Sequence, residues 1–177
     1  MTTSLVQACV NFTGPQEGCE LFPYRDNARS GNATVAYGHL LPNAAYAAQV
    51  FGVALDILQT QWDDLMKAEG GKPAHFYETL TELRLSQGKA DDLFCSDLEF
   101  HVDKCARIVP GFMALPQSIQ TAVVDLDFNV RGGIETFPKM LAAIARKDWP
   151  AVAAESDRPQ LPARSKATRD LILSVLA

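Results

Sequence analysis

The segment from Glu17 to His39, E-G-C-E-L-F-P-Y-R-D-N-A-R-S-G-N-A-T-V-A-Y-G-H, differs in character from the rest of the chain. Turn-forming residues, among them Asn27, Ser30 and Gly31, surround one good strand candidate, the β-prone run T-V-A-Y at residues 34–37. This pattern predicts a small hairpin sheet. Most of the chain's candidate reactive side chains lie in the same segment.

Helical periodicity dominates the remaining sequence. Apolar residues at spacings of three and four predict one helix over residues 43–68, with Asn43 as its N-cap and Gly70-Gly71 after its end. The same periodicity predicts further helices over residues 94–109, 119–130, 136–147, 149–156 and 167–177. A small β element beside a mostly helical body defines an α+β protein.

Size and charge exclude several classes of protein. The chain has 177 residues, of which 47% are hydrophobic and 21% charged, and this composition predicts an ordinary globular domain with one core. Its net charge of -5 argues against nucleic-acid binding and against a polybasic membrane anchor. The N-terminal residues lack a basic region and a continuous apolar run, so we expect no Sec signal peptide, and we expect no membrane span.

The four cysteines are Cys9, Cys19, Cys95 and Cys105, and none forms a CxxC pair. The three histidines show no zinc spacing, so we expect no structural metal. Cys95 and Cys105 are about 15 Å apart along one predicted helix, too far for a disulfide. We interpret the four residues as reduced, mostly packed thiols. A disulfide such as Cys9–Cys19, formed in an oxidising compartment, is the alternative.

Two carboxylates of the hairpin segment suggest a chemistry. Glu17 and Asp26 are nine residues apart, and both could face one cleft. Glycoside hydrolysis needs one carboxyl group that stays protonated and a second that stays ionised. Solvated carboxylates in a polar loop are the more common explanation of such a pair, so the spacing by itself does not identify an enzyme.

Several motifs, taken together, resemble the signature of phage-type lysozymes. These enzymes carry Glu-Gly-x-x-Leu-x-x-Tyr-x-Asp, followed by a short hairpin that ends in Thr-x-Gly-x-Gly-His. Matching or similar segments are E-G-C-E-L-F-P-Y-R-D (Glu17–Asp26), T-V-A-Y-G-H (Thr34–His39), D-D-L-F-C-S-D-L (Asp91–Leu98), L-D-F-N-V-R-G-G (Leu126–Gly133), K-D-W (Lys147–Trp149) and A-R-S-K-A-T-R-D (Ala163–Asp170).

The resemblance covers residues 5–40 and 84–175. It implies a lysozyme-like fold, in which a small β-hairpin lobe and a larger helical lobe flank a substrate groove. We therefore expect the whole chain to form a single lysozyme-like domain. Its β lobe would span about residues 17–42 and its helical lobe about residues 84–177. Residues 41–83 form a helical insert that resembles nothing in the family, and either a packed helical hairpin or an interaction surface would explain it.

The family's catalytic roles carry over to three residues. Glu17 would be the general acid at the glycosidic oxygen. Asp26 would orient or activate the attacking water, or stabilise the oxocarbenium-like transition state. Thr34 would hold that water through its hydroxyl. Related enzymes of the T-even phage type invert the anomeric centre, so inversion is expected, and no cofactor or metal is expected.

Further positions match the family outside this catalytic set. Asn129 and Tyr24 would contact the substrate. His39 and Asp97 correspond to a structural ion pair, and Arg164 corresponds to a basic residue behind the catalytic glutamate.

The sequence also departs from the family pattern. Ala36 replaces the first glycine of the hairpin motif, a position that favours a glycine backbone. The loop between Asp26 and Thr34 is two residues longer, Gly14-Pro15 interrupts the helix before the acid, and Arg131 follows Phe-Asn-Val in place of glycine. These departures motivate an alternative, a lysozyme-fold module that binds peptidoglycan or a protein partner without cleavage.

The function implied by the resemblance is a muramidase that cuts the β-1,4 bond between N-acetylmuramic acid and N-acetylglucosamine in bacterial peptidoglycan. A glucosaminidase or chitinase-like activity would be a related alternative. The protein would be a monomer, made in the cytoplasm and active in the periplasm or cell wall. It would reach its substrate as a phage endolysin through a holin pore, or as an injected effector with a cognate inhibitor or immunity protein. The acidic charge favours the effector, since wall lysozymes often use positive charge.

Overall fold

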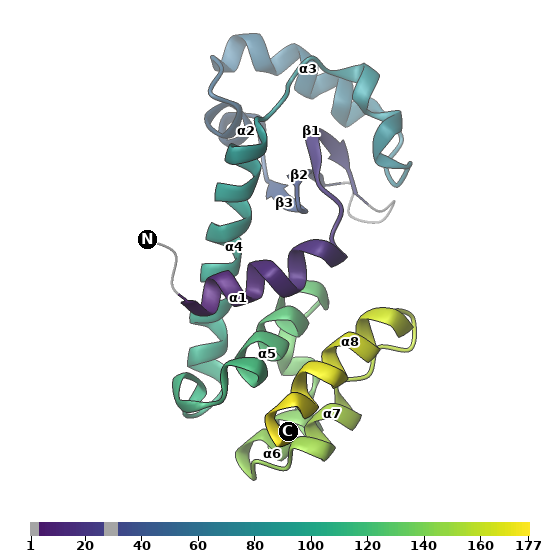
Figure 1. Cartoon of the computed structure of the whole chain (residues 1–177). Coiled ribbons are helices and arrows are strands. Elements are labelled where there is room, and N and C mark those ends of the chain that lie inside the picture. Colours follow the sequence, from purple (N-terminus) through teal and green to yellow (C-terminus); the bar gives the residue numbers. More distant parts are fainter. Residues whose placement is uncertain (1–3, 27–31) are drawn as a thin grey trace. The chain divides into compact units, whose positions relative to one another are not determined.

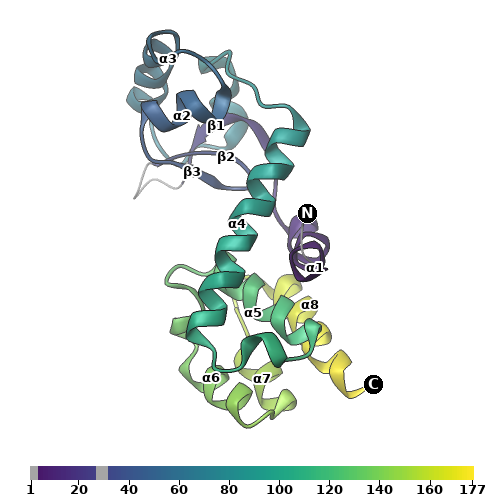
Figure 2. The same ribbon diagram turned by 90° about the vertical axis from the view of Figure 1, so that its left-hand side faces the viewer.

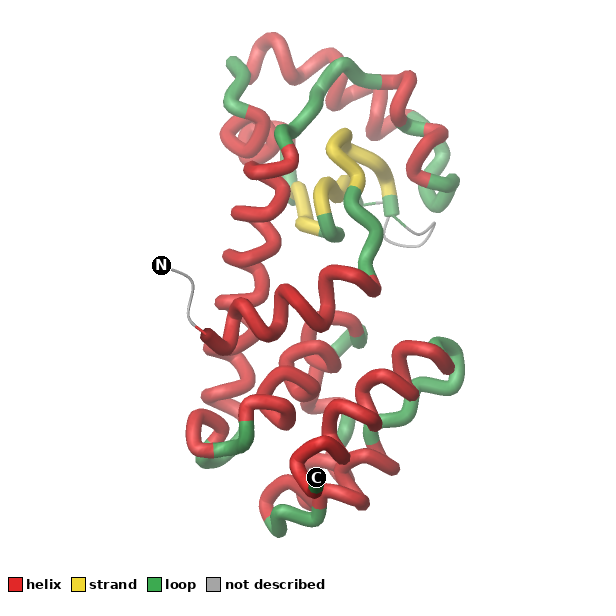
Figure 3. The backbone as a smooth tube through the Cα atoms, viewed as in Figure 1, coloured by secondary structure: helices red, strands yellow, loops and turns green. Residues whose placement is uncertain are grey.

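The computed structural model describes residues 4–26 and 32–177 and shows an α+β protein that is mostly helical, with one small antiparallel sheet (Figures 1 and 3). The turn residues predicted at Asn27, Ser30 and Gly31 lie outside the described residues. The α-helices are α1 (Ser4–Thr13), α2 (Ala44–Phe51), α3 (Leu55–Lys67), α4 (Gln87–Ile108), α5 (Gln117–Asn129), α6 (Pro138–Ala145), α7 (Trp149–Glu155) and α8 (Pro162–Leu173). Short 3₁₀ turns are η1 (Gly14–Gln16), η2 (Ala74–Phe76), η3 (Glu78–Leu80), η4 (Phe112–Ala114), η5 (Gly133–Thr136) and η6 (Ser174–Leu176).

Internal contacts divide the chain into two compact units. Unit 2 is the continuous stretch Glu17–Phe94, which contains the sheet. Unit 1 combines Met1–Gln16 with Cys95–Ala177. The boundary on the C-terminal side falls within α4, between residues 94 and 95.

The sheet of unit 2 has three strands in the order β1-β2-β3, namely Glu20–Arg25, Ala33–Ala36 and His39–Leu41. The strand predicted at residues 34–37 is confirmed as β2, one residue earlier than expected. Sequence periodicity did not indicate β1, which contains Pro23. Proline is tolerated there because β1 lies at the edge of the sheet order, and because its pairing with β2 is irregular between Glu20 and Tyr24.

The prediction of one continuous helix over residues 43–68 is wrong, because this segment forms two helices, α2 and α3. Asn43 caps α2 as predicted, and its side-chain oxygen accepts a hydrogen bond from the Tyr46 backbone N–H at 2.9 Å. Gly52 then adopts a left-handed conformation (φ 68°) and ends α2. A glycine in this conformation stops a helix even where the apolar spacing continues.

The insert that the resemblance left unplaced builds the core of unit 2. Figure 2 shows α2 and α3 beside the strands. Val35 and Leu41 of the sheet, Leu58 of α3 and Tyr77 after η2 belong to one buried cluster, each at most 1% exposed. The Tyr77 hydroxyl donates to the Glu69 carbonyl at 2.6 Å, which ties the end of the insert to the turn after α3. Residues 41–83 therefore pack as an integral part of unit 2.

Unit 1 is assembled around α5. Residues Ile119 to Asp127 of this helix are buried on every face, which identifies it as a central helix. Helix α1 packs beside α5, and α8 contacts it as well (Figures 1 and 2). The helices predicted over residues 94–109 and 119–130 are confirmed by α4 and α5.

The C-terminal helices differ from the prediction only at their ends. Helices α6 and α7 confirm the two predicted over residues 136–147 and 149–156. The last helix, α8, begins at Pro162, five residues before the predicted start. Proline is well suited to the first turn of a helix because its fixed φ matches the helix and its missing N–H is not needed there.

Candidate active site

Glu17 is the first residue of unit 2 and is partly buried. It follows η1, the 3₁₀ turn that forms where Gly14-Pro15 interrupts the N-terminal helix. Proline has no backbone N–H, so the α-helical hydrogen-bond ladder cannot continue through it. The interruption of the N-terminal helix at Gly14-Pro15, expected from the sequence, is therefore present in the structure.

Asp26 follows directly after β1 and is also partly buried. Its backbone N–H donates to the Asn32 carbonyl at 3.0 Å, which joins the two ends of the loop. The longer loop expected between Asp26 and Thr34 falls mainly on residues 27–31, outside the described part of the chain. Asp26 is thus held at the end of the sheet next to the β2 strand.

Thr34 and Tyr24 face each other across β1 and β2. They are directly paired in the antiparallel register, and the Thr34 hydroxyl is 3.5 Å from the Tyr24 carbonyl oxygen. Thr34 is only 5% exposed, so its hydroxyl is a buried polar group with a defined position.

The pKa of the Tyr24 phenol responds to burial and to the predicted catalytic residues. Burial is the largest cause that raises the pKa of Tyr24, and a hydrogen bond with Thr34 opposes this rise. The negative charges of Glu20, Asp26 and Glu17 raise the pKa further. Tyr24 therefore stays protonated at neutral pH, next to a set of carboxylates that includes both predicted catalytic residues. Of these three carboxylates, Glu20 is the one to which the family motif gives no role.

The glycine position of the hairpin motif keeps a glycine-like backbone although it carries a methyl group. Ala36 has φ 57°, in the left-handed region, and is fully buried. Gly38, two residues later, has φ 92°. The hairpin between β2 and β3 therefore has the backbone form that favours glycine, and Ala36 adopts it at a conformational cost.

His39 lies on β3, and its Nε2 atom is 2.9 Å from the Tyr46 hydroxyl at the start of α2. Asp97, its predicted ion-pair partner, lies on α4 in unit 1 and is partly buried. The ion pair stays a prediction.

Arg164 takes part in a buried ion-pair network of unit 1. Its Nη2 atom donates to Asp125 Oδ1 at 2.6 Å, and Arg158 Nη1 donates to Asp125 Oδ2 at 3.2 Å. The Thr13 hydroxyl donates to the same carboxylate at 3.1 Å. Asp125 is 0% exposed, so its charge is stabilised by these donors rather than by water. Asn129 is partly exposed, and its Oδ1 atom accepts from Arg158 at 3.2 Å.

A second buried carboxylate, Asp127, joins α4 to α5. It accepts hydrogen bonds from His101 Nδ1 at 2.6 Å, Lys104 Nζ at 2.7 Å and the Ile134 backbone N–H at 2.8 Å. Burial alone would raise the pKa of Asp127, but these hydrogen bonds outweigh burial and lower it from 3.8 to about 2. Asp127 is therefore ionised at neutral pH and holds η5 against α5.

Sequence periodicity did not indicate these two networks. The available signal was the occurrence of Asp125 and Asp127 inside the apolar run of α5, where a charged side chain needs a partner. Of the predicted site residues, Glu17, Tyr24, Asp26, Thr34 and His39 belong to unit 2, and Asp97, Asn129 and Arg164 belong to unit 1.

The cysteines form no disulfide within the described residues. Cys9 and Cys105 are buried, and burial raises the pKa of the Cys9 thiol to about 12. Cys19 and Cys95 are partly exposed. Among residues 4–26 and 32–177, no three His, Cys, Asp or Glu side chains lie close enough together to hold a metal ion. None of the described helices is both long and apolar enough to cross a lipid bilayer.

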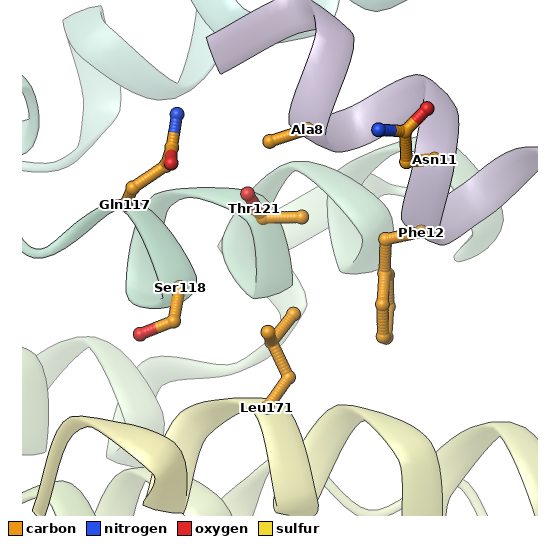
Figure 4. A pocket seen from close by; sticks show the side chains of 7 residues that line it. All are labelled: Ala8, Asn11, Phe12, Gln117, Ser118, Thr121 and Leu171. Atoms are coloured by element: carbon orange, nitrogen blue, oxygen red, sulfur yellow. The ribbon is translucent and has the colours of Figure 1, made fainter. Parts of the chain in front are cut away.

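Unit 1 also contains a pocket of about 390 Å³, separate from the predicted site residues (Figure 4). Residues from α1, α5 and α8 line it, namely Ala8, Asn11, Phe12, Gln117, Ser118, Thr121 and Leu171. Part of its polar lining is engaged within the protein, because Gln117 donates to the Ser4 carbonyl at 3.2 Å and Asn11 accepts from Gln7 at 3.0 Å.

Comparisons with known proteins add no further information on the site. No protein-family model matches the chain, and no curated protein is significantly similar to it in sequence.

Proposed function

We propose that this protein is a peptidoglycan-cleaving glycosidase of the lysozyme type. Its reaction would be hydrolysis of the β-1,4 bond between N-acetylmuramic acid and N-acetylglucosamine. The observation that carries the proposal is the arrangement around Tyr24. The strand register pairs Tyr24 directly with Thr34, and the negative charges of Glu17 and Asp26 raise the pKa of the Tyr24 phenol. Glu17, Asp26 and Thr34 are the three residues that match the family's catalytic motif.

In the proposed reaction, Glu17 donates its proton to the glycosidic oxygen as the bond to the anomeric carbon breaks. Water attacks that carbon from the opposite face and passes a proton to Asp26, which inverts the anomeric configuration. The buried Thr34 hydroxyl would orient this water, because a hydroxyl both donates and accepts. Tyr24, kept protonated, would supply a neutral hydrogen-bond donor beside the carboxylates. Asn129 would contact the glycan, as the family resemblance implies.

The test is product analysis by mass spectrometry on purified sacculi. The wild-type protein should release soluble fragments with N-acetylmuramic acid at the new reducing end, whereas a glucosaminidase would expose N-acetylglucosamine. Glu17→Gln removes the proton donor and should lower turnover by about 10²- to 10⁴-fold with an unchanged circular dichroism spectrum. Glu82→Gln, at an exposed position of the same unit, is the matched control and should retain activity. Intact glycan strands after treatment with the wild-type protein would refute the proposal.

A second candidate is a lysozyme-fold module that binds peptidoglycan without cleaving it. The 3₁₀ turn at Gly14–Gln16 favours this candidate, because it changes the backbone approach to Glu17 relative to the family's helix. Binding of the wild-type protein to sacculi, with no soluble fragment released at any pH from 4 to 8, would support this function over the first.

The distribution of charge bears on the biological setting that we propose. Unit 2 contains eleven acidic and six basic residues, whereas unit 1 contains ten of each, so unit 2 accounts for the whole net charge of -5. An acidic unit does not favour adsorption to an anionic wall, but it would complement a basic inhibitor. An injected effector with a cognate inhibitor therefore fits the proposal as well as a phage endolysin does.

A further inference from the structure

Asn129 shares a buried guanidinium with Asp125. The two residues are four positions apart on α5, so their side chains lie on the same face of the helix. Arg158 Nη1 is 3.2 Å from Asp125 Oδ2 and 3.2 Å from Asn129 Oδ1. This nitrogen carries two hydrogens, so it can donate to both acceptors at once.

The guanidinium of Arg158 is held independently of Asn129. Its Nη2 atom donates to the Thr168 hydroxyl on α8 at 2.6 Å. The Arg158 backbone N–H donates to Ser165 Oγ at 2.7 Å, and this hydroxyl donates back to the Arg158 carbonyl at 3.0 Å. Arg158 is 2% exposed, so the group facing Asn129 has a fixed position and a full charge.

This contact determines the orientation of the Asn129 amide. A guanidinium donates hydrogen bonds and accepts none, so the amide atom that faces it must be the oxygen. The opposite atom, Nδ2, then presents both of its hydrogens away from Arg158. Within the described part of the chain Nδ2 makes no hydrogen bond, and the residue is partly exposed.

We infer that Arg158 is a positioning residue that holds Asn129 as a hydrogen-bond donor to an acceptor oxygen of the bound glycan. This inference rests on the proposed function for the identity of the ligand. An asparagine without such a contact can rotate its amide by 180° and exchange donor for acceptor. With Oδ1 bound to Arg158, Asn129 offers only N–H groups, which match a carbonyl or hydroxyl oxygen and reject an N–H group.

The first experiment measures the Asn129 side-chain amide by NMR in the free protein, with no ligand present. Its ¹⁵N order parameter should be close to that of the rigid backbone, about 0.85, and should fall below about 0.6 in Arg158→Met. Arg169→Met is the matched control, because Arg169 is an arginine of α8 that pairs with Asp157 on the surface at 3.0 Å. It should leave the Asn129 amide unchanged. A mobile amide in the wild type, or a rigid one in Arg158→Met, would overturn the inference.

The second experiment uses Asn129→Asp, which preserves the shape and the acceptor that faces Arg158 but removes the N–H donor. This variant keeps the inference testable even if Arg158→Met does not fold. For a soluble tetrasaccharide of alternating N-acetylglucosamine and N-acetylmuramic acid, KM should rise about tenfold while kcat changes by less than about threefold. Arg158→Met should raise KM similarly, and the double variant should raise it no further than either single variant. An unchanged KM in Asn129→Asp would overturn the inference. It would also be overturned if the rise in KM of the double variant equalled the product of the rises in the two single variants.

The two experiments separate this inference from the proposed function. If the wild-type protein neither binds nor cleaves the tetrasaccharide, the proposed function fails. The NMR result on the free protein still decides whether Arg158 orients the Asn129 amide.

Discussion

Replacing Asp127 by asparagine tests whether its buried hydrogen-bond network stabilises unit 1. In the folded protein the pKa of Asp127 is lowered from 3.8 to about 2, so the ionised carboxylate is favoured by the native structure. This lowering of the pKa corresponds to about 2 kcal/mol of folding free energy. The side chain is 0% exposed, so little of this value is lost to solvent screening.

The pH dependence of this contribution has a definite sign. Because the folded pKa lies below the unfolded one, the stabilisation is fully present above about pH 4 and is lost as the pH falls toward 2. Asp127→Asn should therefore lower the free energy of unfolding by about 2 kcal/mol at pH 7. The difference between wild type and variant should shrink between pH 4 and pH 2, where the wild-type carboxylate becomes protonated.

Urea unfolding can measure this effect in unit 1 alone. The chain has two tryptophans, Trp62 in unit 2 and Trp149 in unit 1, so a Trp62→Phe background leaves one fluorophore in unit 1. Asp103→Asn, at an exposed position of α4, is the matched control and should change stability by less than about 0.5 kcal/mol. A loss below about 0.5 kcal/mol for Asp127→Asn at pH 7, or a loss that persists unchanged at pH 2, would refute this account of the network.

Three further predictions concern backbone conformation and the proposed site. Gly133→Ala should destabilise unit 1 by at least about 3 kcal/mol in urea unfolding, because its Cβ would lie within 2.1 Å of Asp127 Oδ1 at φ +67°. Gly52→Ala, at φ +68°, should lower the stability of the protein by about 1 kcal/mol. Gly88→Ala, inside α4 and with open space around the added Cβ, should raise the stability by about 0.5 kcal/mol. Equal effects of the two variants in thermal melts would contradict the conformational argument. Tyr24→Phe should lower kcat/KM on sacculi about tenfold with an unchanged melting temperature, and full activity would remove Tyr24 from the proposed site.

The elements that were predicted correctly are those determined by local sequence. The apolar stripe of α5 and the Asn43 cap of α2 each depend on residues within one or two helical turns. The break at Gly52 was missed because the apolar spacing continues through it, and a single left-handed residue leaves that periodicity intact. Strand β1 was missed because it contains Pro23 and is defined by its pairing with β2, which only the tertiary fold provides.

In the candidate site, too, local features could be predicted from the sequence, whereas contacts between distant elements could not. The motif placed Tyr24 and Thr34 in one hairpin segment, although it did not give the register that pairs them. It could not predict the partners of Asp125 and Asp127, because these come from other helices. Asp125 and Asp127 are two positions apart on α5, so their side chains point to nearly opposite sides of the helix. Asp125 binds Arg158, which follows α7, and Arg164 of α8. Asp127 binds His101 and Lys104 of α4. Sequence periodicity identifies a buried carboxylate but cannot select its partner.

The division of the chain into one continuous and one discontinuous unit has a consequence for how the protein is synthesised. All of unit 2 has left the ribosome once residue 94 has emerged, so its sheet and its insert can fold while the rest of the chain is still being made. Helix α1 precedes unit 2 in the chain but packs on α5, so more than a hundred further residues must be made before its apolar face is covered. During that interval Leu5, Val6 and Cys9, all buried in the finished protein, are available to chaperones or to other nascent chains.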